Sequence, residues 1–229
     1  MNNDPLSDAK IVDSWNKNAS AWVAAVRGGL IESRRQVTDD AIIEAVMSCV
    51  PRTVLDIGCG EGWLARSLAE KGVAVVGIDA VSSLVEQARR GGGGTFHTLS
   101  YEDLAAGALR DRADVIVSNF ALLGNESVNG VVRVARTLLN PGGSLVVQTL
   151  HPAVSCGALP YRDGWREGSW DGFGSAFTDP APWYFRTLQS WTRLFADSGL
   201  RLRALREPLS PATGKPASII FVASPTGQD

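Results

Sequence analysis

Apolar positions along the chain follow two spacings, one typical of helices and one typical of buried strands. Within residues 11–26 they recur every three or four positions, and Gly28 and Gly29 come next, so this stretch predicts an amphipathic N-terminal helix. Thr38 is placed to cap a second helix, which should end before Pro51. The first 50 residues are therefore predicted to be helical.

Five short runs rich in Val, Ile and Leu follow, with helical stretches between most of them. The runs are TVLDIG (53–58), VAVVGID (73–79), TFHTLS (95–100), ADVIVSN (113–119) and SLVVQTL (144–150). Near-continuous apolar strands joined by helical crossovers predict a parallel sheet that is covered on both faces.

The C-terminal part of the chain breaks this rhythm. A helical stretch over about 184–198 leads into LRLRALREPL, and only a short Ser- and Pro-containing connection separates that run from ASIIFVAS. Parallel neighbours need a crossover of about a dozen residues or more, so these last two strands are predicted to be antiparallel neighbours.

Composition narrows the class of protein. With 229 residues, 45% hydrophobic and 20% charged, the chain is predicted to form one well-buried domain. The net charge of −2 and the scattered Lys and Arg residues argue against a nucleic-acid partner. Neither a signal-peptide pattern nor an apolar run of about 20 residues occurs, so we expect a cytoplasmic protein without a membrane partner. Cys49, Cys59 and Cys156 lack paired spacing, which predicts small buried side chains rather than disulfides or a metal site.

The most informative motif is TVLDIGCGEGWLARSLAEKG, in which three glycines alternate with other residues after a strand. A strand that passes through a glycine-rich turn into a helix lets the backbone approach a ligand closely and offers free N–H groups there. The next strand ends at Asp79, 21 residues after Gly58, where a carboxylate is suited to accept ribose hydroxyls. The alternative for Asp79 is a simple helix cap.

The spacing of the glycines separates two cofactor classes. Dinucleotide sites carry G-x-G-x-x-G, whereas this chain has Gly58, Gly60 and Gly62 preceded by Asp56, an acid that suits an amine-bearing ligand better than a pyrophosphate. VLDIGCGEG resembles the first motif of the class I S-adenosylmethionine-dependent methyltransferases, and VVGIDAV resembles their second. The antiparallel C-terminal strand pair is also similar to that family's sheet.

The resemblance covers roughly residues 53–224 and implies a Rossmann-like α/β fold: a doubly wound sheet, mostly parallel with an antiparallel C-terminal strand pair, and helices on both faces. It implies S-adenosylmethionine as cofactor, with S-adenosylhomocysteine as product. SYEDL (100–104) falls where the family contacts adenine, DVIVSNFALL (114–123) where it lines the methionine arm, and LLNPGGSLVV (138–147) where it turns into the fifth strand. Ser100 replaces the family's commoner aspartate. The candidate cofactor contacts are Arg34, Asp56, Gly58, Gly60, Asp79, Ala80, Tyr101, Glu102, Asn119 and Phe120.

The N-terminal segment WNKNASAWVAAVRGGLIESRR resembles the lid helix that many small-molecule methyltransferases lay over the cofactor. The carboxylate of that cofactor needs a cationic partner, which Arg27 or Arg34 can supply through a bidentate contact. We favour Arg34. The alternative is that both arginines are solvated surface residues.

An aromatic-rich segment follows the fifth strand and predicts the acceptor site. Residues 151–185 contain 8 of the 17 aromatic residues, interleaved with Gly and Pro, and long irregular insertions of this kind are usually functional. An aromatic cover would exclude water and hold an apolar or planar acceptor through Trp165, Trp170 and Tyr184. The alternative is an aromatic plug that seals the edge of the sheet.

His151 is the candidate general base, because it follows a strand at the ligand-facing edge, whereas His97 lies within the third strand and is predicted to be structural. The alternative for His151 is a packing role.

We predict methyl transfer to a small molecule by a monomer or homodimer. The alternatives are a protein or RNA acceptor, a non-catalytic cofactor-binding module, and a dinucleotide-dependent oxidoreductase.

The single domain is expected to divide into four parts. Residues 1–50 form the lid helices, 51–151 the cofactor-binding core, 152–182 the aromatic insertion, and 183–229 the C-terminal helix and strand pair.

Overall fold

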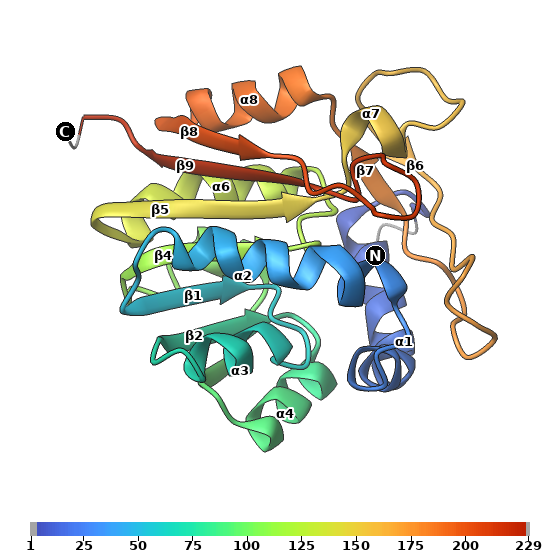
Figure 1. The fold of residues 1–229 in the computed structure, drawn as a ribbon, viewed down its shortest axis with the longest axis horizontal. Helices are drawn as coiled ribbons and strands as arrows, with labels where there is room; N and C mark the ends of the chain where they lie inside the picture. The colour runs from blue at the N-terminus through green and yellow to red at the C-terminus, as the bar shows by residue number, and fades with distance from the viewer. Residues whose placement is uncertain (1–3, 228–229) are drawn as a thin grey trace.

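A computed structural model describes residues 4–227, and a seven-stranded sheet with the order β3-β2-β1-β4-β5-β9-β8 forms its centre (Figure 1). The strands are β1 (Thr53–Ile57), β2 (Ala74–Asp79), β3 (Thr95–Thr98), β4 (Ala113–Asn119), β5 (Leu139–Thr149), β8 (Leu200–Arg206) and β9 (Ile219–Pro225). The five strands from β3 to β5 pair in parallel, and β9 pairs antiparallel with both β5 and β8. The predicted doubly wound sheet with an antiparallel C-terminal pair is confirmed.

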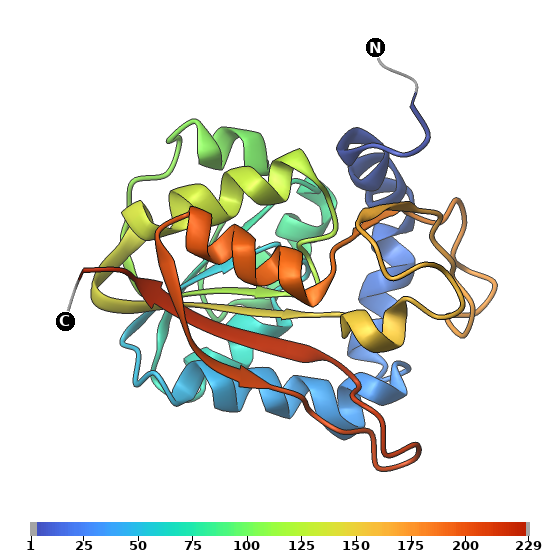
Figure 2. The same ribbon diagram turned by 90° about the horizontal axis from the view of Figure 1, so that it is seen from above.

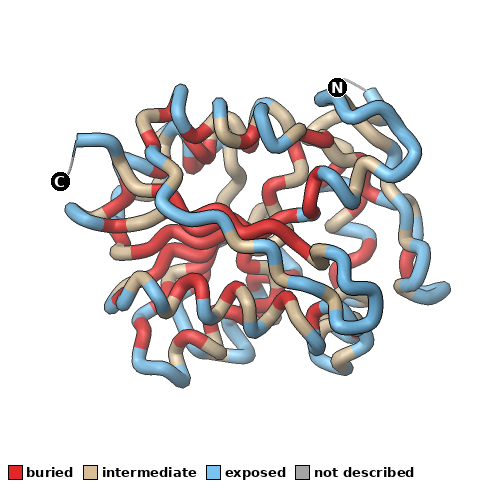
Figure 3. Tube along the Cα trace, turned by 45° about the horizontal axis from the view of Figure 1, so that its top comes forward, coloured by how far each residue is buried: buried red, intermediate tan, exposed pale blue. Residues whose placement is uncertain are grey.

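Helices cover both faces of this sheet, so that the strands lie between two layers (Figure 2). The helices are α1 (Asp8–Arg27), α2 (Asp39–Met47), α3 (Trp63–Ala69), α4 (Ser82–Gly91), α5 (Tyr101–Ala105), α6 (Glu126–Leu138), α7 (Pro152–Ser155) and α8 (Leu188–Asp197). One apolar cluster joins α2, α3 and α4 to the sheet, and a second joins α5, α6 and α8 to its other face. The central strands β1, β4, β5 and β9 accordingly contain the longest buried runs of the chain (Figure 3).

The helix α1 lies apart from these layers, across the end of the sheet where the parallel strands finish. Its inward face includes the buried residues Ile11, Ser14, Asn18, Ala19 and Ala25, which confirms the predicted amphipathic helix. The segment after α7 runs along the same end, and both views place it beside α1 (Figures 1 and 2). Among the helices of residues 4–227, none has the length and apolar character needed to cross a bilayer.

Two details of the helices and strands differ from the sequence prediction. Thr38 does not cap a helix with its side chain, because a π-helical turn η1 (Arg34–Thr38) leads directly into α2. The strand β5 begins at Leu139, so NPGG forms part of the strand rather than a turn before it; Leu139 pairs with Ala113, and the Asn140 side chain donates to Asp114.

The aromatic insertion is more ordered than predicted. It contains α7 and a two-stranded antiparallel sheet, β6 (Gly164–Arg166) with β7 (Trp183–Phe185). Because Tyr184 belongs to β7, the last helix α8 starts later than predicted, at Leu188, where the Thr187 hydroxyl accepts a hydrogen bond from the Ser190 N–H.

Candidate active site

A cavity of about 440 Å³ opens at the carboxyl ends of β1, β2 and β4, beneath α1 and the aromatic insertion. Ligands of open α/β sheets bind at this edge, because the loops that follow the parallel strands meet there. Nine of the ten predicted cofactor contacts line the cavity: Arg34, Gly58, Gly60, Asp79, Ala80, Tyr101, Glu102, Asn119 and Phe120. Asp56 is the tenth, and it lies behind the wall.

The three glycines after β1 meet different constraints, although all have positive φ angles. A Cβ on Gly58 would stand 2.3 Å from the Ala121 Cβ, and one on Gly62 would stand 2.9 Å from the Ala88 Cβ, so both glycines permit close packing within the protein. A Cβ on Gly60 would meet only the Trp22 Nε1 within 4 Å, at 3.7 Å. Gly60 is therefore the glycine whose bare backbone faces the cavity.

Asp79 ends β2 and holds the glycine loop in place. Its carboxylate accepts the Gly60 N–H and the Val81 N–H, each at 2.9 Å. Burial raises the pKa of Asp79, and these two N–H donors oppose the rise. Since each carboxylate oxygen has a second lone pair, Asp79 can also accept hydroxyl groups from a ligand in the cavity.

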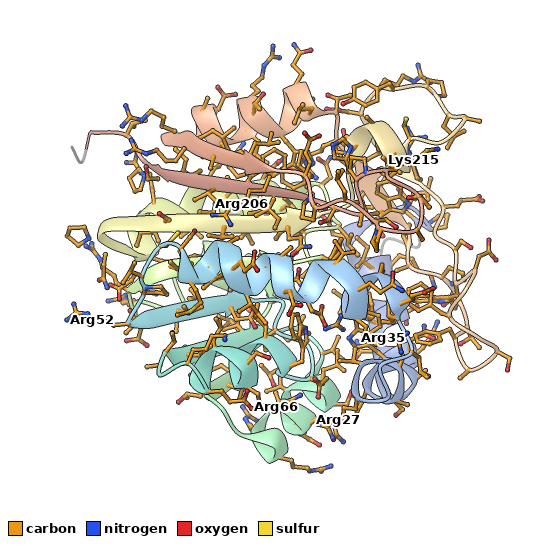
Figure 4. The ribbon with its side chains drawn as sticks, viewed as in Figure 1. Arg27, Arg35, Arg52, Arg66, Arg206 and Lys215 are labelled. Atoms are coloured by element: carbon orange, nitrogen blue, oxygen red, sulfur yellow. The ribbon has the colours of Figure 1, made fainter. Side chains whose placement is uncertain are left out.

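The two candidate arginines have different environments. Arg27 donates to Glu61 at 2.8 Å, and Arg66 donates to the same buried carboxylate at 2.6 Å, so both side chains are engaged at the glycine loop (Figure 4). Arg34 lines the cavity, where its guanidinium lies over the Trp63 ring at 4.4 Å and its Nε donates to Asp39 at 2.9 Å. The structure thus brings Arg34, and not Arg27, into the cavity wall.

Three polar atoms of lining residues are buried without a partner within the described chain: Arg34 Nη1, Thr38 Oγ1 and Asn119 Oδ1. Leaving such groups unpaired is costly, so they indicate a ligand that supplies partners. An amino-acid carboxylate suits Arg34 and Thr38, because both side chains have donors. Together with the carboxylate of Asp79 and the open Gly60, these atoms fit S-adenosylmethionine.

Asp56 carries a strongly perturbed carboxyl group beneath the glycine loop. It is 2% exposed, and its Oδ2 has no hydrogen-bond partner among the described residues. Burial, followed by repulsion from Asp79, raises the pKa of Asp56 to about 7. The carboxyl group is therefore poised to change its charge near neutral pH.

The loops after β3 and β4 complete the floor of the cavity. Ser100 caps α5, and the next residue, Tyr101, donates its hydroxyl to the Ala121 carbonyl at 3.2 Å, so this phenol ties the two loops together. Phe120 has a φ of +52°, an unusual backbone conformation for a bulky residue. Such strain persists where the surroundings hold it, and here it shapes a cavity wall.

Aromatic side chains from two distant segments form the opposite wall. Trp15 and Trp22 of α1 meet Trp170 and Phe173 of the insertion, with ring centroids 5.6 Å apart for Trp15 and Trp170. Of the three predicted acceptor contacts, only Trp170 lines the cavity. Trp165 and Tyr184 lie outside the set of lining residues and pack edge to face against each other, at 5.6 Å, across the β6-β7 pair.

Sequence reasoning did not single out several residues of this wall. Trp15 and Trp22 are seven positions apart on one helix face, but this spacing also suits simple packing, so it gave no functional signal. Phe173 and Trp183 were counted among the aromatics of the insertion and were not selected, although both line the cavity.

His151 is not brought to the cavity. It is 8% exposed, its Nε2 lies 2.7 Å from the Glu207 Oε1, and it is absent from the lining, although its neighbour Leu150 is present. The prediction placed His151 at the correct end of β5. The orientation of its ring depends on the contact with Glu207, which lies 56 positions later and could not be predicted from the local sequence. His97 is exposed on β3.

The sheet order, the glycine loop and the acid at the end of β2 define a Rossmann-like protein with a nucleoside-type cavity. The chain belongs to the family described as the methyltransferase domain, whose family model matches residues 32–205. This confirms the family prediction made from the glycine loop and the ordered motifs that follow it.

Curated relatives match about half of this chain. The ubiquinone biosynthesis O-methyltransferase of Paraburkholderia xenovorans (strain LB400) is 35% identical over 113 residues, 48% of this chain and 49% of that protein. The chain spans about half the length of the curated relatives that it matches.

Solved structures share the fold over a longer stretch. A magnesium protoporphyrin IX methyltransferase from Synechocystis PCC 6803, with bound SAH, has a TM-score of 0.69 at 18% identity and covers 96% of this chain and 100% of that chain. A 1,6-didemethyltoxoflavin-N1-methyltransferase from Burkholderia thailandensis has a TM-score of 0.64 at 15% identity, with 92% and 88% covered.

Proposed function

We propose that the protein transfers the methyl group of S-adenosylmethionine to a small planar acceptor. The observation that carries this proposal is the cavity itself, which combines the bare backbone of Gly60, the carboxylate of Asp79 and the unpartnered guanidinium nitrogen of Arg34. In this arrangement Asp79 accepts the ribose hydroxyls and Arg34 binds the amino-acid carboxylate. Membership in the methyltransferase domain family supports the same chemistry.

The residues of the chain contribute binding, orientation and exclusion of water. When bound, the cofactor supplies an electrophilic methyl group on a sulfonium. Backbone groups at Gly58, Gly60 and Phe120 fix its position, while Asp56 keeps a negative potential beneath the loop when ionised. The aromatic wall closes the cavity from the solvent side, and alignment without water is the main need of an in-line displacement.

The acceptor is proposed to be planar and uncharged at neutral pH. Trp15, Trp170, Phe173 and Trp183 offer flat apolar surfaces. Among the described lining residues Arg34 is the one cation, against three carboxylates, Asp8, Asp79 and Glu102. An anionic acceptor would therefore lack a counter-charge once Arg34 binds the cofactor.

The accepting atom is proposed to be nucleophilic without a histidine base. Neither His nor Lys occurs among the described lining residues, and Asp8, which reaches the acceptor side, already accepts the Asn125 and Ser127 N–H groups at 2.8 and 3.1 Å. A neutral ring or amine nitrogen meets this requirement, because its lone pair can attack without prior loss of a proton. Such a small acceptor also suits an enclosed cavity better than a protein or RNA chain does.

A two-stage experiment tests the proposal. Calorimetry with S-adenosylhomocysteine should first show stoichiometric binding, and absence of binding would refute the cofactor assignment. Methyl-labelled S-adenosylmethionine is then incubated with planar aromatic amines and nitrogen heterocycles, each paired with its carboxylated derivative. We expect label in uncharged members and at least tenfold less in their carboxylated partners; a preference for the carboxylated members would refute the acceptor class.

A further inference from the structure

One helix connects the cofactor side of the cavity to its aromatic wall. At its C-terminal end α1 contacts the glycine loop, through Arg27 and the buried Glu61 at 2.8 Å and through Trp22 beside Gly60. Nearer its N-terminal end, the same helix contacts the insertion at Thr178 and Asp179. One continuous helix, α1, therefore joins the two contacts.

The contact between α1 and the insertion is built around Asn18, which is 1% exposed. Its Nδ2 donates to the Thr178 carbonyl at 2.7 Å, and its Oδ1 accepts the Thr178 N–H at 2.8 Å. A side-chain amide that satisfies both backbone groups of one residue fixes the position and the orientation of that residue. The two partners are 160 positions apart in sequence.

The Thr178 carbonyl links this contact to the aromatic wall, because it also accepts the Trp170 indole N–H at 2.9 Å. Trp170 in turn packs against Trp15 and Phe173. Asn18 thus determines the position of the carbonyl that orients a ring of the acceptor wall.

The neighbouring residue Asp179 adds further contacts of a different kind. Its φ is +47°, and it is held by Lys10 and Lys17 on its carboxylate and by the Ser14 hydroxyl on its carbonyl, the last at 2.5 Å. Both lysines are at least partly exposed to solvent, and ion pairs at the surface stabilise little. The buried amide of Asn18 is therefore the stronger determinant of the contact.

We propose that Asn18 is a positioning residue that makes the acceptor wall dependent on the cofactor: occupation of the cofactor site fixes α1, and Asn18 then sets Thr178 and Trp170. This inference rests on the proposed function. It implies that the cofactor binds before the acceptor, because the wall that holds the acceptor is completed only when α1 is fixed.

The test uses S-adenosylhomocysteine as the probe and 5-fluorotryptophan as the label. The fluorine resonance of Trp170, assigned by its loss in Trp170→Phe, should shift when the probe binds to the wild-type protein. In Asn18→Ala the affinity for the probe should stay within about threefold, while the Trp170 shift is lost. Asn16→Ala is the matched control, because Asn16 is exposed on the same helix and donates only to the Val12 carbonyl.

The outcomes separate the inference from the proposed function. If S-adenosylhomocysteine does not bind to the wild-type protein, the proposed function fails. If it binds and Trp170 shifts equally in Asn18→Ala, or does not shift in the wild type, the inference is overturned. A measurement that needs no variant covers the case in which Asn18→Ala does not fold: the probe should slow hydrogen exchange within residues 168–181 at least tenfold, and unchanged exchange overturns the inference.

Discussion

Replacing Asp56 with Asn should stabilise the ligand-free protein, and the gain should grow as the pH rises. The carboxyl group is buried, and its pKa is raised from 3.8 to about 7. Below about pH 4 it is protonated in both the folded and the unfolded chain. As the pH rises from about 4 to about 7, the unfolded chain loses the proton while the folded chain retains it, so the free energy of unfolding decreases.

The magnitude of the stabilisation follows from the difference between the folded and unfolded pKa values of Asp56. A difference of about three pKa units corresponds to an upper limit of ~4 kcal/mol at pH 8, and to roughly 1.7 kcal/mol at pH 5, where the unfolded carboxyl is ionised and the folded one is not. Asn removes the charge but leaves its own amide without a partner, which offsets part of this gain. We therefore expect Asp56→Asn to stabilise by about 2 to 4 kcal/mol at pH 8, and by clearly less at pH 5.

Thermal unfolding of both proteins at pH 5 and pH 8 measures this difference. For a chain of this length 1 kcal/mol corresponds to about 2–4 °C in the melting temperature, so the effect at pH 8 is readily measured. A variant no more stable than the wild type at pH 8, or a gain that is equal at the two pH values, would refute the reasoning.

Asp114→Asn is the control, because its expected change in the free energy of unfolding has the opposite sign to that of Asp56→Asn. The Asn140 side chain, with the N–H groups of Arg52 and Thr53, lowers the pKa of Asp114 to about 2. Its ionised form is therefore stabilising above about pH 4, and that stabilisation is lost only as the pH falls through about 2. Asp114→Asn should lower the melting temperature at pH 5 and pH 8 alike.

Four further substitutions of cavity residues, with Trp165→Ala as a control outside the cavity, test the proposed roles. Asp79→Ala should weaken S-adenosylhomocysteine binding by about 1–3 kcal/mol in calorimetry, because the ribose loses a charged acceptor, and unchanged affinity would exclude that role. Gly60→Val should abolish binding while the circular dichroism spectrum is preserved; binding at wild-type strength would mean that no ligand approaches this backbone. Arg34→Met should reduce the calorimetric affinity at least tenfold, and an equal affinity would leave the carboxylate without its proposed partner. With an acceptor found by screening, Trp170→Ala should lower the rate of methyl transfer far more than the cofactor affinity, whereas Trp165→Ala should change only the melting temperature; equal losses of rate in both variants would contradict the placement of the acceptor.

The central sheet and the cofactor side of the cavity were predictable because their signals are local. Each parallel strand is a short apolar run, and the glycine loop places Gly60 and Asp79 at the ends of adjacent strands whatever the rest of the chain does. Sheet topology then brings together residues that are far apart in sequence: Asn119 and Phe120, which the family resemblance placed beside the methionine arm, line the cavity at the end of β4.

The acceptor side was less predictable because its geometry depends on distant pairings. The strands β6 and β7 have three residues each, too few to show an alternation of apolar and polar positions. The only signal in the insertion was therefore its high content of aromatic residues. Composition cannot separate Trp170, which faces the cavity, from Trp165, which packs on Tyr184. The same limit applies to His151, whose direction is fixed by Glu207 in a different part of the chain.

The interlocking of α1 with the insertion also constrains how the protein can be re-engineered. The family model begins at residue 32, after α1 has ended, so the helix lies outside the residues that the model matches. A chimera that receives a foreign insertion but retains this helix would present Asn18 to a backbone with no matching carbonyl and N–H, and it would leave a buried amide unsatisfied. Exchange of acceptor preference between relatives should therefore succeed when the first helix and the loop are transplanted as a pair, and fail when either is moved by itself.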